Sequence, residues 1–202
     1  MFPGSPAGGD KSLAVLAGQP MIAHVIARLA PQVARLIINA NGDPERFAPF
    51  GLEVVPDLGE PDQGPLAGLL AAMAWAERSA RDVRAILSVS TDTPFLPADL
   101  AARLAAEAGA GAAIAASLGR VHPVIGLWPL SLRESLERAL SERRRSVEKF
   151  ASQSDAVAVA FAPVTMEGQT IDPFFNANTP EDLAKAHALL APTFRPKEQA
   201  NG

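Results

Sequence analysis

Asp92 is the residue that the sequence places best for chemistry. It follows a short apolar run, residues 85–89, of the length expected for a strand buried on both faces, and Pro94 and Pro97 come soon after it. Asp92 should therefore lie at the carboxyl end of a strand, which is the edge of an open α/β sheet where ligands bind. A carboxylate held there in a rigid turn suits a metal ion. The alternative interpretation is that Asp92 only caps the helix that starts near Pro97.

Two further polar side chains follow predicted strands in the same way. Asn39 ends the apolar run that begins at residue 35, and Asp57 follows the run that begins at residue 52. Because parallel strands end at a common edge, we expect Asn39, Asp57 and Asp92 to converge there. A plainer interpretation of each stays open: Asn39 could simply end its strand, and Asp57 could cap a local turn.

The elements that must position these residues alternate between helix and strand. Helices are predicted to start near Pro20, Pro65, Pro97, Leu130, Val147 and Thr179, and further strands are predicted at 112–116, 122–128 and 156–161. Such alternation predicts an α/β fold, a three-layer Rossmann-like domain with a mostly parallel sheet. Residues 1–191 are predicted to form this single domain, with a glycine- and proline-rich loop over residues 1–10, and residues 192–202 a polar tail.

Composition excludes several classes of protein. The 202 residues are 48% hydrophobic, include no cysteine and no tyrosine, and carry a net charge of -4. Disulfides, thiolate metal sites, a membrane span and general attraction to nucleic acid are therefore unsupported. We expect a cytoplasmic enzyme or binding protein, and a monomer.

Several motifs in order and spacing resemble one known family, the molybdenum cofactor guanylyltransferases. The resemblance runs from Gly8 to about Leu190. It is carried by Gly8-Gly9-Asp10-Lys11-Ser12-Leu13, Gly18-Gln19-Pro20-Met21-Ile22, Asn39-Ala40-Asn41, Asp57, Gly64-Pro65-Leu66-Ala67-Gly68, Asp92-Thr93-Pro94-Phe95, His122-Pro123-Val124 and the run from Asn176 to Leu183.

The resemblance implies a nucleotidyltransferase that moves GMP from GTP to the terminal phosphate of molybdopterin, with pyrophosphate leaving and Mg²⁺ required. It implies that Lys11 touches the GTP phosphates, that Asn39 and Asp57 contact the guanosine, and that Asp92 holds the metal. Lys11 and Asp92 would then be the catalytic pair, because attack on the α-phosphorus gathers negative charge that the Lys11 ammonium and a magnesium ion on Asp92 would neutralise. Asn178 is a further candidate at the metal or at the pterin substrate. Recipient molybdoenzymes or their chaperones are the partners implied downstream.

Other interpretations stay open at this point. A cytidylyltransferase for the same cofactor would share the fold, although Thr93 favours the guanylyl group because the cytidylyl relatives usually have glutamine there. A non-catalytic chaperone for the cofactor is the alternative from a different class. Lys11 could be a solvated lysine. His122 is interpreted as a hydrogen-bonded structural residue. Arg143-Arg144-Arg145 could contact the pterin phosphate or simply end a helix.

The sequence departs from the family pattern at its start. The family begins with an apolar strand and an arginine-containing loop, whereas only MFPGSPA precedes Gly8 here. The expectation is that the first, central strand and most of the phosphate-cradling loop are missing, through a start codon placed too late or in a true short, impaired form. We favour the misplaced start because Lys11, Asp57 and Asp92 are kept. Magnesium-dependent GTP binding by these 202 residues is predicted to be weak.

Overall fold

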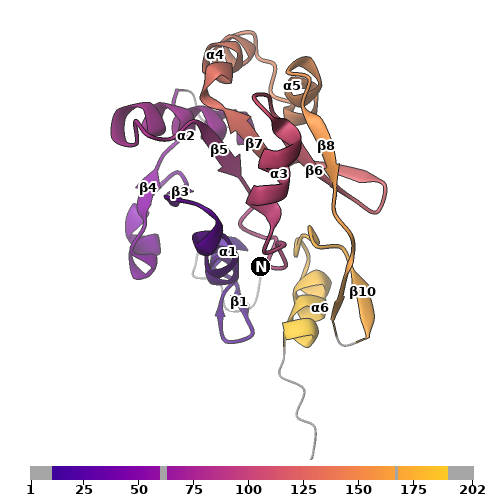
Figure 1. Ribbon diagram of the computed structural model, residues 1–202. Coiled ribbons are helices and arrows are strands. Elements are labelled where there is room, and N and C mark those ends of the chain that lie inside the picture. The colour runs from indigo at the N-terminus through magenta and orange to yellow at the C-terminus, as the bar shows by residue number, and fades with distance from the viewer. Residues whose placement is uncertain (1–10, 60–62, 167, 191–202) are drawn as a thin grey trace, which may run out of the picture.

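Helices alternate with strands between residues 21 and 108 of the computed structural model, and pairs of strands follow one another elsewhere; the structure describes residues 11–59, 63–166 and 168–190 (Figure 1). The longer helices are α1 (Met21–Leu29), α2 (Pro65–Ser79), α3 (Leu100–Ala108), α4 (Arg133–Ser141), α5 (Val147–Gln153) and α6 (Pro180–Leu190). The strands are β1 (Val15–Leu16), β2 (Gln19–Pro20), β3 (Ile37–Asn39), β4 (Glu53–Val55), β5 (Ala85–Ser88), β6 (Ala113–Ser117), β7 (Arg120–Pro129), β8 (Val157–Ala160), β9 (Val164–Met166) and β10 (Gln169–Ile171). Short 3-10 helices cover Lys11–Leu13, Ala30–Gln32, Pro44–Phe50 and Leu130–Leu132.

The largest sheet has the strand order β5-β7-β6-β8. β8 runs parallel to β6, whereas β7 runs antiparallel to both β5 and β6. The reversal has a local cause. Only Leu118 and Gly119 connect β6 to β7, and their φ angles of 48° and 75° place both in the left-handed region that two-residue hairpin turns require. The fold is therefore α/β, as predicted. Its largest sheet combines one parallel pair of strands with two antiparallel pairs.

β3 and β4 form a separate parallel pair, with Asn39 opposite Val55. Within the described ranges, β3 bonds to β4 alone and β5 to β7 alone, so each of these two strands keeps one edge without a neighbouring strand. A cavity of about 680 Å³ lies between those two edges. Whether a strand is missing there stays a prediction, because residues 1–10 lie outside the described ranges.

Helices cover both faces of the sheet, which makes the predicted three layers (Figure 1). Alternate residues of β6 face different helices: Ala113 and Ala115 pack in the cluster that holds Leu100 and Leu104 of α3, whereas Ile114 packs in the cluster that holds Leu66 of α2. This alternation is the period-2 pattern of a strand buried on both sides. α1 belongs to the α3 layer, and α4 and α5 belong to the α2 layer.

A further apolar cluster joins the two ends of the described chain. Leu16 of β1 and Met21 of α1 pack with Leu183 of α6 and Ile171 of β10, and Phe95, beyond β5, belongs to the same cluster. The β1–β2 and β9–β10 hairpins were not among the predicted elements. The predicted loop at 1–10 and the predicted tail at 192–202 lie outside the described residues, and the single domain over 1–191 stays a prediction. None of the helices in the described ranges is long and apolar enough to cross a membrane.

Candidate functional site

Asn39 and Asp57 come together as predicted, at the carboxyl ends of β3 and β4. The Asn39 side-chain amide donates to Asp57 Oδ1 at 3.0 Å and to the Val55 carbonyl at 3.0 Å. Asn41, which the sequence analysis placed in the same motif, donates to Asp57 Oδ2 at 2.8 Å and accepts from the Asp57 backbone N–H at 2.9 Å. We call Asn39, Asn41 and Asp57 the β3–β4 group. Its carboxylate is held by an amide on each oxygen and keeps further lone pairs for a ligand.

Gly68 explains the glycine-rich start of α2. A Cβ built on Gly68 would lie 2.1 Å from Asn39 Oδ1 and 3.4 Å from Asp57 Oδ1. Only glycine therefore lets the first turn of α2 lie against this pair. The amino end of the helix, which carries a partial positive charge, is thereby brought beside the Asp57 carboxylate.

Asp92 lies in a tight turn after β5, as predicted. Its Oδ1 accepts a short hydrogen bond from Ser90 Oγ. Thr93 Oγ1 donates to the Ser90 carbonyl at 2.7 Å, and Thr93 is 2% exposed. α3 begins only at Leu100, after Asp99. The interpretation of Asp92 as a helix cap is therefore excluded, and its carboxylate is oriented by the turn itself.

Lys11 and Asn178 lie beside this turn. Lys11 Nζ donates to Asn178 Oδ1 at 3.4 Å, and the N–H of the neighbouring Ala177 donates to the Asp92 carbonyl at 3.0 Å. We call Lys11, Asp92 and Asn178 the β5 group. These residues come from three distant parts of the chain. Ala177, next to Asn178, is fully buried in the apolar cluster that joins the chain ends, and its packing holds Asn178 beside the Asp92 turn.

The two groups lie on either side of the cavity between β3 and β5. Asn39 lines this cavity from one side, and Thr91, next to Asp92, lines it from the other. The hydrogen bonds Asn39–Asp57 and Lys11–Asn178 each lie within one group, and Lys11 is not among the residues that line the cavity. Asn39, Asp57 and Asp92 were predicted to converge at one edge. They lie in two polar groups on either side of one opening and do not form a single cluster of touching side chains.

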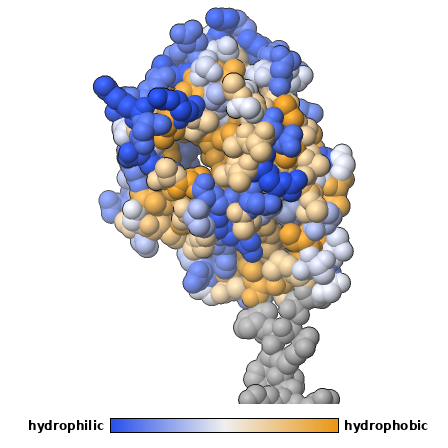
Figure 2. All heavy atoms as spheres, viewed as in Figure 1, coloured by the Kyte–Doolittle hydropathy of each residue, from blue (hydrophilic) through white to orange (hydrophobic). Residues whose placement is uncertain are grey.

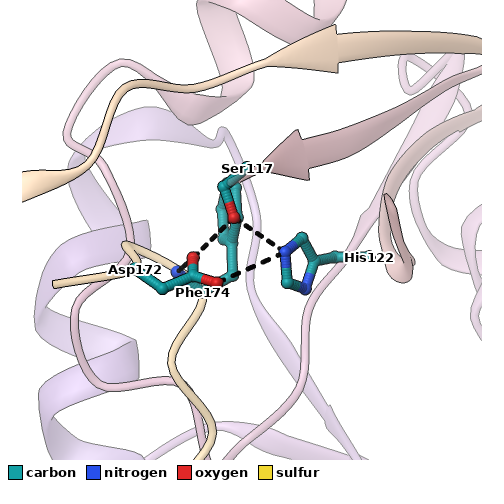
Figure 3. A network of polar contacts seen from close by, with 4 residues as sticks. All are labelled: Ser117, His122, Asp172 and Phe174. Atoms are coloured by element: carbon teal, nitrogen blue, oxygen red, sulfur yellow. Dashed lines mark hydrogen bonds and ion pairs between the residues drawn. The ribbon is translucent and has the colours of Figure 1, made fainter. Parts of the chain in front are cut away.

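A polar network that the sequence analysis did not anticipate joins Ser117, His122 and Asp172 (Figure 3). Ser117 Oγ donates to Asp172 Oδ1 at 2.6 Å and lies 2.8 Å from His122 Nε2, while Asp172 Oδ2 lies 3.6 Å from the same nitrogen. Because a serine hydroxyl has one hydrogen and a carboxylate can only accept, His122 Nε2–H is the donor to Ser117. A nucleophilic triad needs serine and aspartate on different imidazole nitrogens, so this network is not one.

The network instead ties the β6–β7 hairpin to the segment that leads to Asn178. Asp172 Oδ1 also accepts from the Phe174 N–H at 2.8 Å, and the Phe174 ring lies 5.0 Å from the His122 ring, centroid to centroid. Burial lowers the pKa of His122, and this effect outweighs the opposing charge of Asp172, while Arg120 lowers it further. The prediction that His122 is a hydrogen-bonded structural residue is confirmed. Ser117 and Asp172 carried no signal in the sequence, since 55 residues separate them.

The arginine run at the end of α4 divides between two environments. Arg144 pairs with Glu142 at 2.8 Å and donates to Gln153 Oε1. A Cβ on Gly64 would lie 4.0 Å from the Arg145 carbonyl, which places that backbone beside the start of α2. Arg144 is thus engaged within the α4–α5 region, and both interpretations of the arginine run stay open.

Mg²⁺ fits the donors of the β5 group. The described residues contain no cluster of three or more histidine, cysteine, aspartate or glutamate side chains. Mg²⁺ commonly takes one or two carboxylates and completes its shell with water and substrate phosphates. Asp92, with the Asn178 amide nearby, could hold Mg²⁺ in this way.

The fold and the sequence both match known proteins. A family model described as the MobA-like NTP transferase domain matches residues 3–158. A molybdenum cofactor guanylyltransferase of Bradyrhizobium sp. (strain ORS 278) is 50% identical over 188 residues, which cover 91% of this chain and 86% of that protein. One of Rhodopseudomonas palustris (strain BisB5) is 48% identical over 186 residues, covering 90% and 86%.

Solved structures show the same fold at lower identity. Molybdopterin-guanine dinucleotide biosynthesis protein A from Archaeoglobus fulgidus superposes with a TM-score of 0.64 at 22% identity, and covers 92% of each chain. The 4-diphosphocytidyl-2C-methyl-D-erythritol synthase of Anaerococcus prevotii gives 0.66 at 10% identity, again over 92% of each chain. With these matches over most of its length, the chain belongs to the molybdenum cofactor guanylyltransferases, a family of nucleotidyltransferases built on the MobA-like NTP transferase domain.

Proposed function

We propose that this protein transfers the GMP moiety of GTP to the terminal phosphate of molybdopterin and releases pyrophosphate. The observation that carries the proposal is the pair of polar groups that flank one opening at the carboxyl ends of β3, β4 and β5. One group offers a fixed carboxylate, and the other offers a lysine and a second carboxylate. This division suits a ligand with a base at one end and a charged phosphate chain at the other.

The β3–β4 group is suited to the guanosine. Guanine presents N–H donors on its pairing edge, and Asp57 presents a carboxylate whose orientation is fixed by the amides of Asn39 and Asn41. A fixed acceptor loses little freedom when the base binds, so more of the interaction energy is kept as affinity. Asn39 and Asp57 are therefore proposed to contact the guanosine.

The β5 group is suited to the reacting phosphates. A phosphate oxygen of molybdopterin attacks the α-phosphorus of GTP, the bond from the α-phosphorus to its bridging oxygen breaks, and that oxygen leaves with pyrophosphate. Lys11 would hold the phosphate chain and neutralise part of its charge, and Asp92 with Asn178 would hold Mg²⁺. When bound, Mg²⁺ supplies charge neutralisation at the phosphate oxygens.

GTP and molybdopterin are accordingly the proposed substrates, and recipient molybdoenzymes or their chaperones the proposed downstream partners. The proposal places a monomeric enzyme in the cytoplasm. A cytidylyl role is less favoured because the curated relatives described above are named guanylyltransferases. The Thr93 hydroxyl bonds to the Ser90 carbonyl inside the turn, so any influence of Thr93 on the choice of base would be indirect.

Pyrophosphate release measured with GTP, molybdopterin and Mg²⁺ tests the proposal. Because GTP binding by these 202 residues is predicted to be weak, the assay uses a high concentration of GTP. We expect release that needs all three components and that is not supported by CTP at equal concentration. Binding of GTP and molybdopterin without any release would instead indicate a cofactor chaperone. Release from CTP in preference to GTP would indicate the cytidylyltransferase.

A further inference from the structure

The segment between β10 and α6, residues 172–179, carries Asn178 and has neither helix nor strand structure (Figure 1). Phe174 and Ala177 are buried in it, whereas Asn178 is exposed. Figure 2 shows hydrophilic side chains gathered near the middle of the face drawn there, with hydrophobic side chains above and below them. Because no regular hydrogen-bond ladder holds the segment, the orientation of Asn178 depends on the individual contacts of the backbone before it.

Asp172 fixes the start of this segment as a turn. Its Oδ1 accepts from the Phe174 N–H at 2.8 Å, and its carbonyl accepts from the Phe175 N–H at 3.0 Å. An aspartate side chain that bonds the backbone two residues further on is a common way to fix a turn. The Phe174 ring is 2% exposed and meets the Phe161 ring edge-on, with 5.2 Å between centroids. The turn is therefore anchored both by hydrogen bonds and by packing.

Ser117 and His122 fasten the turn to the largest sheet (Figure 3). Ser117 ends β6, is 3% exposed and donates its single hydroxyl hydrogen to Asp172 Oδ1 at 2.6 Å. His122, on the paired strand β7, donates from Nε2 to Ser117 Oγ at 2.8 Å. β6 lies between β7 and β8, so Ser117 belongs to an inner strand of the sheet. Hydrogen bonds are directional, and these therefore set where the segment begins relative to the sheet.

The other end of the segment meets the Asp92 turn and α6. The Ala177 N–H donates to the Asp92 carbonyl at 3.0 Å, and Thr179 and Asp182 exchange two hydrogen bonds of 3.0 Å at the start of α6. The backbone of Asn178 is thus held on both sides. Only five residues separate the Asp172 turn from Asn178, so a shift of that turn would displace the Ala177 bond and the Asn178 side chain with it.

We propose that Ser117, His122 and Asp172 are positioning residues, which hold Asn178 at the place beside Asp92 where a divalent cation needs its oxygen. The inference rests on the proposed role of Asn178 and Asp92 in holding Mg²⁺. A cation that takes few protein ligands binds well only where those ligands are already oriented, and residues that orient them affect its affinity. In this arrangement the three residues act on the cation only through Asn178.

Hydrogen exchange in the full chain tests the positioning by itself. Asp172→Ala removes the acceptor of Ser117 and Phe174, and Ser117→Ala, which removes only a hydroxyl, covers the case in which Asp172→Ala does not fold. We expect the Ala177 amide to exchange about tenfold faster in Asp172→Ala and about threefold faster in Ser117→Ala. Glu181→Ala is the control, since it removes an exposed carboxylate from the first turn of α6, and should leave Ala177 unchanged. Unchanged exchange at Ala177 in both network variants would overturn the proposal.

His122 offers a conservative replacement. The side-chain amide of glutamine can donate to Ser117 Oγ as the imidazole Nε2–H does, whereas leucine cannot. We expect His122→Leu to speed exchange at Ala177 about threefold, and His122→Gln to stay close to wild type. Equal acceleration by both replacements would show that the volume of the side chain matters and not its hydrogen bond, which would refute the role of His122.

Manganese binding tests whether the positioning acts on the cation. Mn²⁺ takes the oxygen ligands that suit Mg²⁺, and the electron paramagnetic resonance signal of the free ion falls as it binds. We expect the Kd for Mn²⁺ alone to rise about fivefold or more in Asp172→Ala and to stay unchanged in Glu181→Ala. In a chain that already carries Asn178→Ala, adding Asp172→Ala should change this Kd less than about twofold, because its effect passes through Asn178. A general loosening of the fold would weaken binding equally in both backgrounds, and that result would contradict the proposal.

Pyrophosphate release separates this inference from the proposed function. If Asp172 and Asn178 are coupled in Mn²⁺ binding but the protein releases no pyrophosphate from GTP and molybdopterin, the positioning role stands and the transfer of GMP is wrong. If wild type releases pyrophosphate but binds Mn²⁺ no better than Asp172→Ala, the transfer stands and the positioning role is wrong. Absence of Mn²⁺ binding by wild type would reject the metal site and this inference with it.

Discussion

The side-chain amide of Asn39 donates to the carboxylate of Asp57 at 3.0 Å, across two parallel strands that end side by side. The same amide also donates to the Val55 carbonyl, so Asn39 is fixed by the strand that precedes Asp57. The carboxylate therefore points in one direction before any ligand arrives. This preorganisation is what makes Asp57 testable as a contact to the nucleotide.

Asp57→Asn should weaken GTP binding, and it leaves either Asn39 or Asn41 without its acceptor because an asparagine side chain has a single oxygen. Hydrogen bonds to a charged group contribute about 1.5–3 kcal/mol, so we expect the Kd for GTP to rise roughly 10- to 150-fold. Isothermal titration calorimetry measures this change. Glu53→Gln is the matched control, because Glu53 is an exposed acid on β4, the strand that precedes Asp57. An equal loss for both variants would indicate a general effect of charge and not a contact.

Gly68→Ala should damage the β3–β4 group from the helix side. The added Cβ would meet Asn39 Oδ1 at 2.1 Å, so either the amide or the start of α2 must move. We expect weaker GTP binding and a loss of about 1–3 kcal/mol in the free energy of unfolding. Gly111→Ala is the control, since its Cβ would meet only the Ala108 carbonyl at 3.4 Å, and its stability should change by about 1 kcal/mol or less. Unchanged GTP binding by Gly68→Ala would separate α2 from the nucleotide site.

Asp92→Asn should remove the dependence of turnover on Mg²⁺. The amide keeps the size of the side chain and can still accept from Ser90, but it lacks the charge that holds a hard cation. We expect pyrophosphate release to fall by about 100-fold or more at saturating GTP. Asp99→Asn is the matched control, because Asp99 precedes α3 and makes no side-chain capping hydrogen bond. A similar magnesium titration for wild type and Asp92→Asn would refute the metal role.

The stability of the protein should depend on the protonation of His122. Burial lowers the pKa of His122 below the ordinary value of a histidine, about 6.5, so the unfolded chain takes up a proton at a higher pH than the folded chain. The stabilising contribution of neutral His122 is therefore present above about pH 6.5 and decreases as the pH falls through the window below it. Chemical denaturation of wild type and His122→Gln at pH 7.5, 6.5 and 5.5 measures the difference. A wild-type advantage that grows toward low pH would show instead that the charge of Asp172 dominates.

The α/β fold and the positions of Asn39, Asp57 and Asp92 can be predicted from local patterns in the sequence. Asn39 and Asp57 were predictable because the parallel strands that precede them end at one edge. The position of Asp92 was predictable because a short apolar run and two prolines allow only a strand end there. At these positions the local sequence pattern and the overall fold favour the same conformation, so the place of the residue can be predicted from the sequence.

Other parts depend on contacts between distant segments. Lys11 meets Asn178 across 167 residues, and only the packing of α6 against β1 and α1 brings them together. The Ser117–His122–Asp172 network likewise joins two hairpins that no periodic pattern links. The reversal of β7 was missed for a different reason. Its cause is the conformation of Leu118, a residue type that gives no turn signal, beside a single glycine.

The brevity of the β6–β7 connection constrains how this protein can change in evolution. Because successive strand residues face opposite sides of a sheet, a single codon gained or lost between Ser117 and Arg120 that shifts the register of β7, and is not absorbed by a longer turn or a bulge, would turn His122 away from Ser117. The segment that leads to Asn178 would then lose its anchor on the hairpin. Length variation in this family should accordingly be tolerated elsewhere on the surface and be selected against at these two positions.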